Sequence, residues 1–168
     1  MPVQPLLLLP PGSAVFIDAN ILVYGSYGRS QQCVHLFERC ASRELIGVTL
    51  LEVVNEATHH FMLTEARERG LIPKASARAL RQKAALICQL RDYWQRTEQV
   101  LGLDILFVPA SEALLRQAQV ERMTCGLLTN DSLIVACMRH YGIPYIASND
   151  EDFGAISGIT LCRPDDLT

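Results

Sequence analysis

The sequence contains no long apolar run, and this absence excludes one large class of proteins. No apolar stretch approaches the roughly 20 residues that a membrane-spanning helix needs. The stretch from Leu6 to Leu9 is too short for the core of a signal peptide, and no basic residue precedes it. We therefore expect a cytoplasmic protein.

Paired cysteine motifs are also missing. The chain has six cysteines, but none of them forms a C-x-x-C pair, which argues against a zinc ribbon. Several lie in apolar helical stretches, where a reduced cysteine behaves as a small hydrophobic side chain. In a reducing cytosol we do not expect disulfides.

The chain has no overall basic excess, yet its basic residues are concentrated. Its net charge of −3 argues against a strongly basic nucleic-acid binder. Between Arg67 and Arg96, however, eight basic residues accompany two acids, so this segment carries +6 and the remainder −9. On a helix, Lys74, Arg78 and Arg81 would share one face. We predict that this face binds phosphates or an acidic partner, the alternative being a solvated helix face.

The order of the predicted elements indicates the fold class. With 168 residues, 49% apolar and 20% charged, the chain suits one globular domain. Strands are predicted at 14–17, 46–49, 105–108, 145–147 and 159–162. Helices are predicted at 30–43, at 50–69 with Thr49 as cap, at 75–100, at 111–124, and from Thr129 or Asn130 to Gly142. This alternation predicts an α/β fold with a parallel sheet and helices on both faces. We expect a single domain over residues 1–168, with 1–13 an extended lead-in and 70–103 a protruding helical insertion.

Acidic residues follow the ends of two predicted strands and begin one helix. Asp18 comes directly after the strand 14–17, and Asp150 lies just past the strand 145–147. Asp131 falls in the first turn of the helix that begins at Thr129 or Asn130. The carboxyl ends of parallel strands are where α/β proteins build their sites. A carboxylate at the inner end of a buried strand is costly unless it is paired or metal-bound. The alternative is that Asp18 and Asp131 cap helices and that residues 150–152 form a solvated turn.

A fourth acid, Glu56, lies deep in the helix 50–69. Glu52 shares its face one turn earlier, but the helix dipole alone explains an acid near a helix start. Glu56 and His59 match the E-x-x-H spacing of di-iron bundles, which requires a second copy that the chain lacks. If the four acids converge, their repulsion raises pKa values or calls for a cation, and all-oxygen ligands favour Mg²⁺ or Mn²⁺. Such a site suits phosphodiester hydrolysis.

These residues resemble the successive motifs of PIN domains, including the toxin halves of prokaryotic VapBC toxin–antitoxin pairs. The motifs are DAN from Asp18, NE from Asn55, TNDSLIVA from Thr129 and SNDEDF from Ser148. The resemblance covers about Val15 to Pro164. Two features depart from it: Ser148 stands where Thr is more usual, and the region from Arg67 to Val100 is longer than in compact toxins.

The resemblance implies a fold, an activity and partners. The fold is a three-layer α/β/α arrangement whose parallel sheet of about five strands has the order 3-2-1-4-5, which places Asp18 and Asp150 on adjacent strand ends. The activity is cleavage of RNA that depends on Mg²⁺ or Mn²⁺ held by Asp18, Glu56, Asp131 and Asp150. The supporting residues are Asn20, Thr129, Asn130, Ser148 and Asp152, with Lys74, Arg78 and Arg81 binding RNA. The partners are an antitoxin protein and a second copy of the chain in a homodimer.

Two other functions fit part of the pattern. A phosphatase of the haloacid-dehalogenase type would use Asp18 as its nucleophile, but it needs an acid two residues later, where Asn20 stands. It also needs a lysine before the last acids, and none lies between Leu127 and Phe153. The other alternative is a non-catalytic module of the same fold that binds RNA or a partner protein, against which the four intact acids argue.

Overall fold

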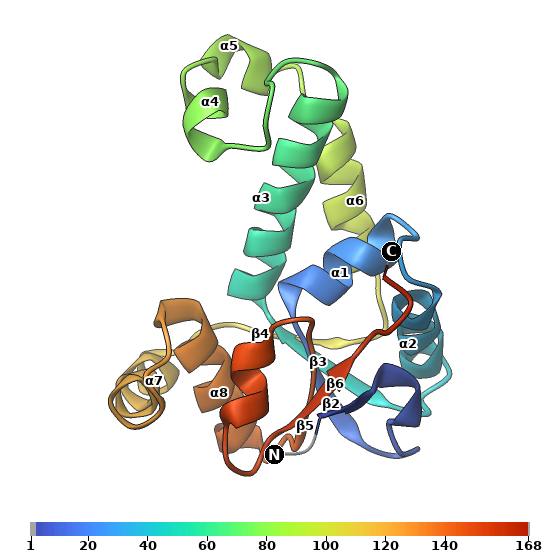
Figure 1. The fold of residues 1–168 in the computed structure, drawn as a ribbon, viewed down its shortest axis with the longest axis vertical. Coiled ribbons are helices and arrows are strands. Elements are labelled where there is room, and N and C mark those ends of the chain that lie inside the picture. Colours follow the sequence, from blue (N-terminus) through green and yellow to red (C-terminus); the bar gives the residue numbers. More distant parts are fainter. Residues whose placement is uncertain (1–2, 168) are drawn as a thin grey trace.

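The protein is built around a parallel sheet with helices on both sides and a long arm on one side (Figure 1). The computed structural model describes residues 3–167. Across these residues the sheet has six strands, all parallel, in the order β1-β6-β5-β2-β3-β4. The strands are β1 (Val3–Pro5), β2 (Ala14–Ile17), β3 (Ile46–Leu50), β4 (Leu106–Val108), β5 (Tyr145–Ala147) and β6 (Thr160–Arg163). The α/β class and the order of the five predicted strands are confirmed.

The sixth strand corrects the prediction for the start of the chain. Residues 1–13 were expected to be an extended lead-in, but Val3–Pro5 pairs in register with β6 and forms one edge of the sheet. The short 3₁₀ helix η1 (Leu6–Leu8) follows, and its Leu6 is buried in the main core. Packing of this leucine-rich segment, rather than its prolines, decides its structure. Residues 1 and 2 lie outside the described part.

Eight α-helices and a second 3₁₀ helix complete the described chain. They are α1 (Ala19–Ser26), α2 (Gln31–Ala41), α3 (Leu51–Glu68), α4 (Ala77–Arg81), α5 (Ala84–Ile87), α6 (Asp92–Leu101), α7 (Glu112–Cys125), α8 (Thr129–Tyr141) and η2 (Glu151–Ala155). In Figure 1, α7 and α8 lie on one side of the sheet, and α1 and α2 lie on the other. No helix within residues 3–167 has the length and apolar character needed to cross a bilayer.

Local capping signals account for some helix ends and fail at others. The hydroxyl groups of Ser30 and Ser111 accept hydrogen bonds from Cys33 and Leu114 and so cap α2 and α7 at the residues where those helices were predicted to begin. Gly142 ends α8 with a left-handed φ of 65°. Thr49 does not cap α3, because its hydroxyl donates instead to the carbonyl of Ile17 at 2.8 Å.

The start of α8 also differs from its prediction. The residue before its first turn is Leu128, so neither Thr129 nor Asn130 is the cap, and no side chain in the described structure caps this end. Asp131 nevertheless lies in the first turn, as expected. From Ser132 to Met138 every residue of α8 is buried, in keeping with its apolar sequence. The helix therefore fixes Asp131 rigidly against the core.

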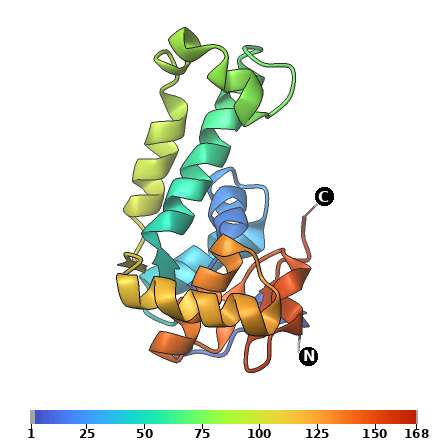
Figure 2. The same cartoon turned by 90° about the vertical axis from the view of Figure 1, so that its left-hand side faces the viewer.

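The region predicted as one helix over 75–100 is broken into α4, α5 and α6. Figures 1 and 2 show α3 and α6 rising side by side from the sheet, with α4 and α5 at their far end. A separate small core holds this end together; it consists of Leu63, Ala66, Ile72, Leu80 and Leu90. On one straight helix Leu80 and Leu90 would lie about 15 Å apart along the axis, so packing both into this core bends the chain. Lys74 precedes α4, so the prediction that it shares a helical face with Arg78 and Arg81 is wrong.

Candidate active site

Asp18 lies at the carboxyl end of β2 with both carboxylate oxygens occupied. Its Oδ1 accepts a hydrogen bond from the Ala19 amide at 2.7 Å, so Asp18 does cap α1. Its Oδ2 accepts from Asn20 Nδ2 at 2.6 Å and from Ser148 Oγ at 2.7 Å. The residue is only 8% exposed. These bonds hold the carboxylate in one orientation.

Burial dominates the electrostatics of Asp18. Desolvation raises its pKa from 3.8 to about 6, although the hydrogen bonds from Ser148 and Ala19 act in the opposite direction. The negative charges of Glu56 and Asp131 raise the pKa further. At neutral pH the charged form of Asp18 therefore destabilises the folded protein.

A polar network joins the ends of the neighbouring strands β2 and β5. The Asp18 amide donates to the carbonyl of Ala147 at 3.1 Å. Ser148 Oγ also accepts from the Asp150 amide at 3.0 Å, and Asn20 Oδ1 accepts from the Asn149 amide at 3.0 Å. Asn20 and Ser148 thus position the loop that carries Asp150. Asp150 in turn accepts from the Asp152 amide at 3.0 Å and begins η2.

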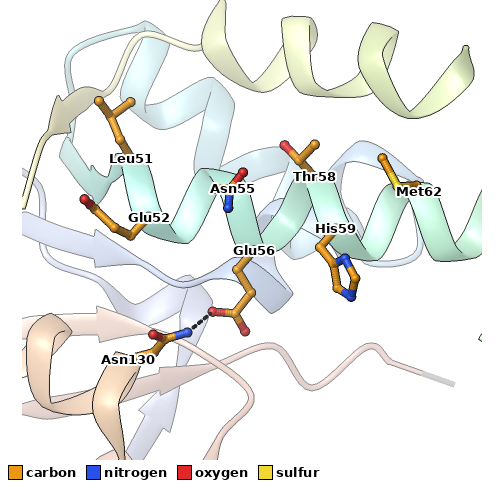
Figure 3. Close-up of a pocket in the computed structure, with 8 residues that line it drawn as sticks. All are labelled: Leu51, Glu52, Asn55, Glu56, Thr58, His59, Met62 and Asn130. Atoms are coloured by element: carbon orange, nitrogen blue, oxygen red, sulfur yellow. Dashed lines mark hydrogen bonds between the residues drawn. The ribbon is translucent and has the colours of Figure 1, made fainter. Parts of the chain in front are cut away.

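Glu56 and Asp131 reach the same edge of the sheet from two helices. Asn130 Nδ2 donates to Glu56 Oε2 at 3.0 Å and so joins α8 to α3 (Figure 3). Within the described chain the Asp131 carboxylate has no hydrogen bond or ion pair, although it is half-buried. Burial raises its pKa, and the charges of Asp150, Glu56 and Asp152 raise it further.

The structure therefore places the four predicted acids in one electrostatic neighbourhood without closing them into a tight cluster. The negative charge of Glu56 raises the pKa of both Asp18 and Asp131, and the charge of Asp150 raises the pKa of Asp131. Among residues 3–167, no three acidic, histidine or cysteine side chains converge closely enough to form a metal site. Glu52 stays outside, since its carboxylate accepts from the Ala110 amide at 3.2 Å.

The predicted supporting residues divide into two groups. Asn20, Asn130 and Ser148 contact the acids directly, as described above. The side chain of Thr129 is exposed at the start of α8, and Asp152 is exposed in η2, where it acts on Asp131 through its charge. The sequence offered no signal for the hydrogen bond between Ser148 and Asp18, which are 130 positions apart.

The basic residues of the arm serve two purposes. Arg69, Lys83, Arg91 and Arg96 donate to backbone carbonyl groups and so maintain the structure. Lys74, Arg78 and Arg81 are exposed, and their side chains make no hydrogen bond or ion pair with any described residue. All three side chains are therefore available to bind a ligand. Arg78 and Arg81 lie on α4, whereas Lys74 lies in the segment before this helix.

A groove that was not predicted runs along α3 beside Glu56. It has a volume of about 740 Å³ and is lined by Leu51, Glu52, Asn55, Glu56, Thr58, His59, Met62 and Asn130. Figure 3 shows these side chains along one side of the helix, with Asn130 facing Glu56 from α8. The spacing of Glu52, Glu56 and His59 was the available signal, since it places them on one helical face.

A parallel sheet with acids at the ends of its central strands defines a class of α/β proteins whose site lies at the switch point of the strand order. The model of the PIN domain family matches residues 15–159, so the chain belongs to this family. A search of the curated proteins gives no match.

Solved structures share this fold at low sequence identity. VapBC2 of Rickettsia felis, crystallised with a promoter DNA fragment, has a TM-score of 0.60 at 15% identity, covering 90% of this chain and 99% of that chain. A toxin–antitoxin complex from Klebsiella pneumoniae has a TM-score of 0.56 at 17% identity, covering 88% and 95%. VapC20 of Mycobacterium tuberculosis, a toxin that cleaves the sarcin–ricin loop, has a TM-score of 0.53 at 20% identity, covering 84% and 93%. At these identities the similarity establishes the fold, which confirms the VapC-like resemblance at the level of architecture.

Proposed function

We propose that this protein is a metal-dependent endoribonuclease that hydrolyses phosphodiester bonds of RNA. The observation that carries the proposal is the position of four carboxylates, from β2, α3, α8 and the loop after β5, at the switch point of the sheet. Asp18 is buried there among like charges, which raise the pKa values of Asp18 and Asp131. A divalent cation would relieve this repulsion, and an all-oxygen donor set fits Mg²⁺ or Mn²⁺.

Each residue of the site has a role that follows from its contacts. Asp18, Glu56, Asp131 and Asp150 would hold the cation, which when bound lowers the pKa of a water and polarises the phosphate. Ser148 and Asn20 fix Asp18, and Asn130 orients Glu56. Asp131 has free lone pairs to offer, and Asp152 adds negative charge beside it. Hydrolysis adds water across the bond between phosphorus and the 3′ oxygen, which leaves a 3′ hydroxyl on one product and a 5′ phosphate on the other.

The finer assignment is that of a toxin in a toxin–antitoxin pair, and the shared fold of the VapBC structures supports it. An antitoxin protein and a second copy of the chain would then be its partners. A small gene that overlaps the upstream end and encodes a DNA-binding protein with a disordered tail would distinguish this class from other nucleases. The phosphatase alternative lacks support, because the amide of Asn20 is engaged with Asp18 and Ser148.

The substitution Asp131→Asn tests the proposal. It keeps the shape of the side chain and removes the charge that would hold a cation. We expect RNA cleavage in Mg²⁺ or Mn²⁺ to fall by about 100-fold or more, the scale seen when one electrostatic group is lost from a catalytic site. The metal-free fold should be as stable as wild type or slightly more so, because its raised pKa means that the charged form is disfavoured.

The control is Asp92→Asn. Asp92 is likewise an acid in the first turn of a helix, α6, but it is exposed and lies in the arm. If acids in first turns served only the helix dipole, the two variants would behave alike, since Asn caps about as well as Asp. EDTA should abolish cleavage by the wild type. Wild-type cleavage by a folded Asp131→Asn protein would refute metal-dependent cleavage at these four carboxylates.

A further inference from the structure

The groove along α3 has a lining that does not suit phosphate. Its eight lining residues include the carboxylates of Glu52 and Glu56 and no lysine or arginine. Phosphate groups would be repelled from its interior at neutral pH. Whatever enters the groove from a nucleic acid is therefore the base and not the backbone.

The same lining does suit a nucleotide base. Leu51 and Met62 offer apolar surface, while Asn55 and Asn130 offer amide donors and acceptors. His59 is exposed, and its ring nitrogens make no hydrogen bond with any described residue. A base has apolar faces that stack on aromatic rings and polar edges that bond to amides, which matches this combination.

The groove also lies in the right place for such a base. The Glu56–Asn130 pair of the candidate active site lies in its lining, about one helical turn along α3 from Leu51 and Glu52. His59 follows Glu56 by about 4.5 Å along the helix axis. At its upper end Met62 packs against the small core of the arm, which includes Leu80 of α4. Leu80 stands between the free basic residues Arg78 and Arg81, so cations are available outside the groove for the backbone of the same strand.

We propose that this groove is a base-binding subsite for one unpaired nucleotide beside the bond that is cleaved. The His59 ring stacks on the base, and Asn55 and Asn130 contact its edges. The identity of the ligand as RNA rests on the proposed function. A base in a duplex is stacked on its neighbours with its edges paired, so the subsite selects single-stranded or loop RNA.

Binding of a fluorescein-labelled oligouridylate of about twelve nucleotides tests the subsite. The measurement is fluorescence anisotropy in Mg²⁺, using the full chain with Asp131→Asn so that no cleavage interferes. His59→Ala should weaken binding about tenfold, within the range for loss of one stacked base. His59→Phe should restore binding to within about threefold, because it keeps the aromatic face.

His60→Ala is the matched control, since His60 is an equally exposed neighbouring histidine that does not line the groove. It should bind within about twofold of the parent, and the same oligomer annealed to its complement should bind the parent about tenfold more weakly. Equal losses for His59→Ala and His60→Ala, or equal affinity for duplex and single strand, would overturn the subsite. The subsite would also be overturned if His59→Ala left binding unchanged or if the parent did not bind the oligomer. The groove would then be a candidate site for a protein segment instead.

Cleavage by chains with intact Asp131 separates this inference from the proposed function. If both hold, His59→Ala raises KM and changes kcat less, because His59 positions the substrate and does not touch the reacting atoms. Selective binding without any cleavage would contradict the nuclease alone. Metal-dependent cleavage that His59→Ala leaves unchanged would contradict the subsite alone.

Discussion

Asp18 caps a helix with the same side chain to which we assign a chemical role. One oxygen caps α1 and the other accepts two side-chain hydrogen bonds, so the carboxylate cannot turn without breaking a bond. A buried carboxylate that served only as a cap would have less reason to lie among other acids. Its orientation is therefore fixed before any ligand arrives, as a catalytic group requires.

The stability of the metal-free protein should show the cost of this carboxylate. The pKa of Asp18 is about 6 when folded and near 3.8 when unfolded, so the folded state binds the proton more tightly. The protonated residue thus stabilises the fold fully below about pH 4, and this contribution of about 3 kcal/mol is lost as the pH rises through 6. In EDTA, the stability of wild type relative to Asp18→Asn should fall between pH 4 and pH 7. Urea unfolding at both values measures it.

That comparison has its own check. Subtracting the unfolding free energy of Asp18→Asn at each pH removes the effects of other acids, such as Glu65, whose pKa is lowered. Mn²⁺ added at pH 7 should offset the loss in wild type more than in the variant, since binding to the folded state alone stabilises it. A difference between the two proteins that stays constant with pH would show that Asp18 is not strained.

The sequence predicted which acids lie near one another better than it predicted how they are held. Asp18 and Asp150 follow strand ends, and the parallel order makes such ends neighbours, so their proximity could be inferred. The bonds of Ser148 and Asn20 could not, because they depend on side-chain orientation in the folded state. His59 entered the sequence analysis only through its spacing from Glu56, and its exposure in a groove was not predicted.

At the scale of elements, α3 connects the site with the arm. Its first half carries Glu56, and its second half carries Glu65, which is only 4% exposed. The Glu65 carboxylate accepts hydrogen bonds from the amides of Arg91 and Tyr93 at 2.9 and 3.0 Å, and from Arg69 at 3.1 Å. One helix thus caps the start of another, α6, and holds the arm upright.

Glu65→Ala should loosen the arm. The change leaves two partly buried amides at the start of α6 without a partner and should cost roughly 2 kcal/mol of the free energy of unfolding. Glu68→Ala removes an exposed acid from the same turn, with no hydrogen bond or ion pair among the described residues, and should cost less than about 0.5 kcal/mol. In Glu65→Ala, the amide hydrogens of α6 should exchange faster than in wild type, whereas those of β2 should change less. Equal exchange in both elements would mean that the arm does not unfold separately.

This capping explains why the arm was predicted wrongly as one helix. Signals at α2, α7 and α8 are local, since Ser30, Ser111 and Gly142 act on residues within one turn. The start of α6 depends on Glu65, which is 26 positions away from Arg91. Helix propensity favoured a continuous helix, and tertiary packing of Leu80 and Leu90 prevailed over it.

At the scale of the whole molecule, the acids of the candidate site and the free basic residues lie at opposite ends of the arm. The acids lie at the sheet, and the free basic residues lie at the far end of the arm (Figure 2). Arg96 fixes the arm to the body, because its guanidinium lies 3.9 Å from the centre of the Tyr27 ring and donates to the carbonyl of Ser26. The arm is therefore held at a set position relative to the acids, and under the proposed function its basic residues would bind the backbone of the RNA strand that is cleaved at the site.

Charge reversal at the tip of the arm tests this arrangement. Arg78→Glu with Arg81→Glu should weaken RNA binding and reduce the slope of log affinity against log salt by about 1.4, because two phosphate contacts to a single strand are lost. Both side chains are exposed, so the fold should not change. Arg43→Glu with Arg116→Glu alters the net charge equally outside the arm, and breaks only a surface pair of Arg116 with Glu112. Filter binding over a range of salt concentrations separates the two cases: an equal change of slope in both double variants would show a general charge effect, whereas a change confined to the arm would place phosphates on α4.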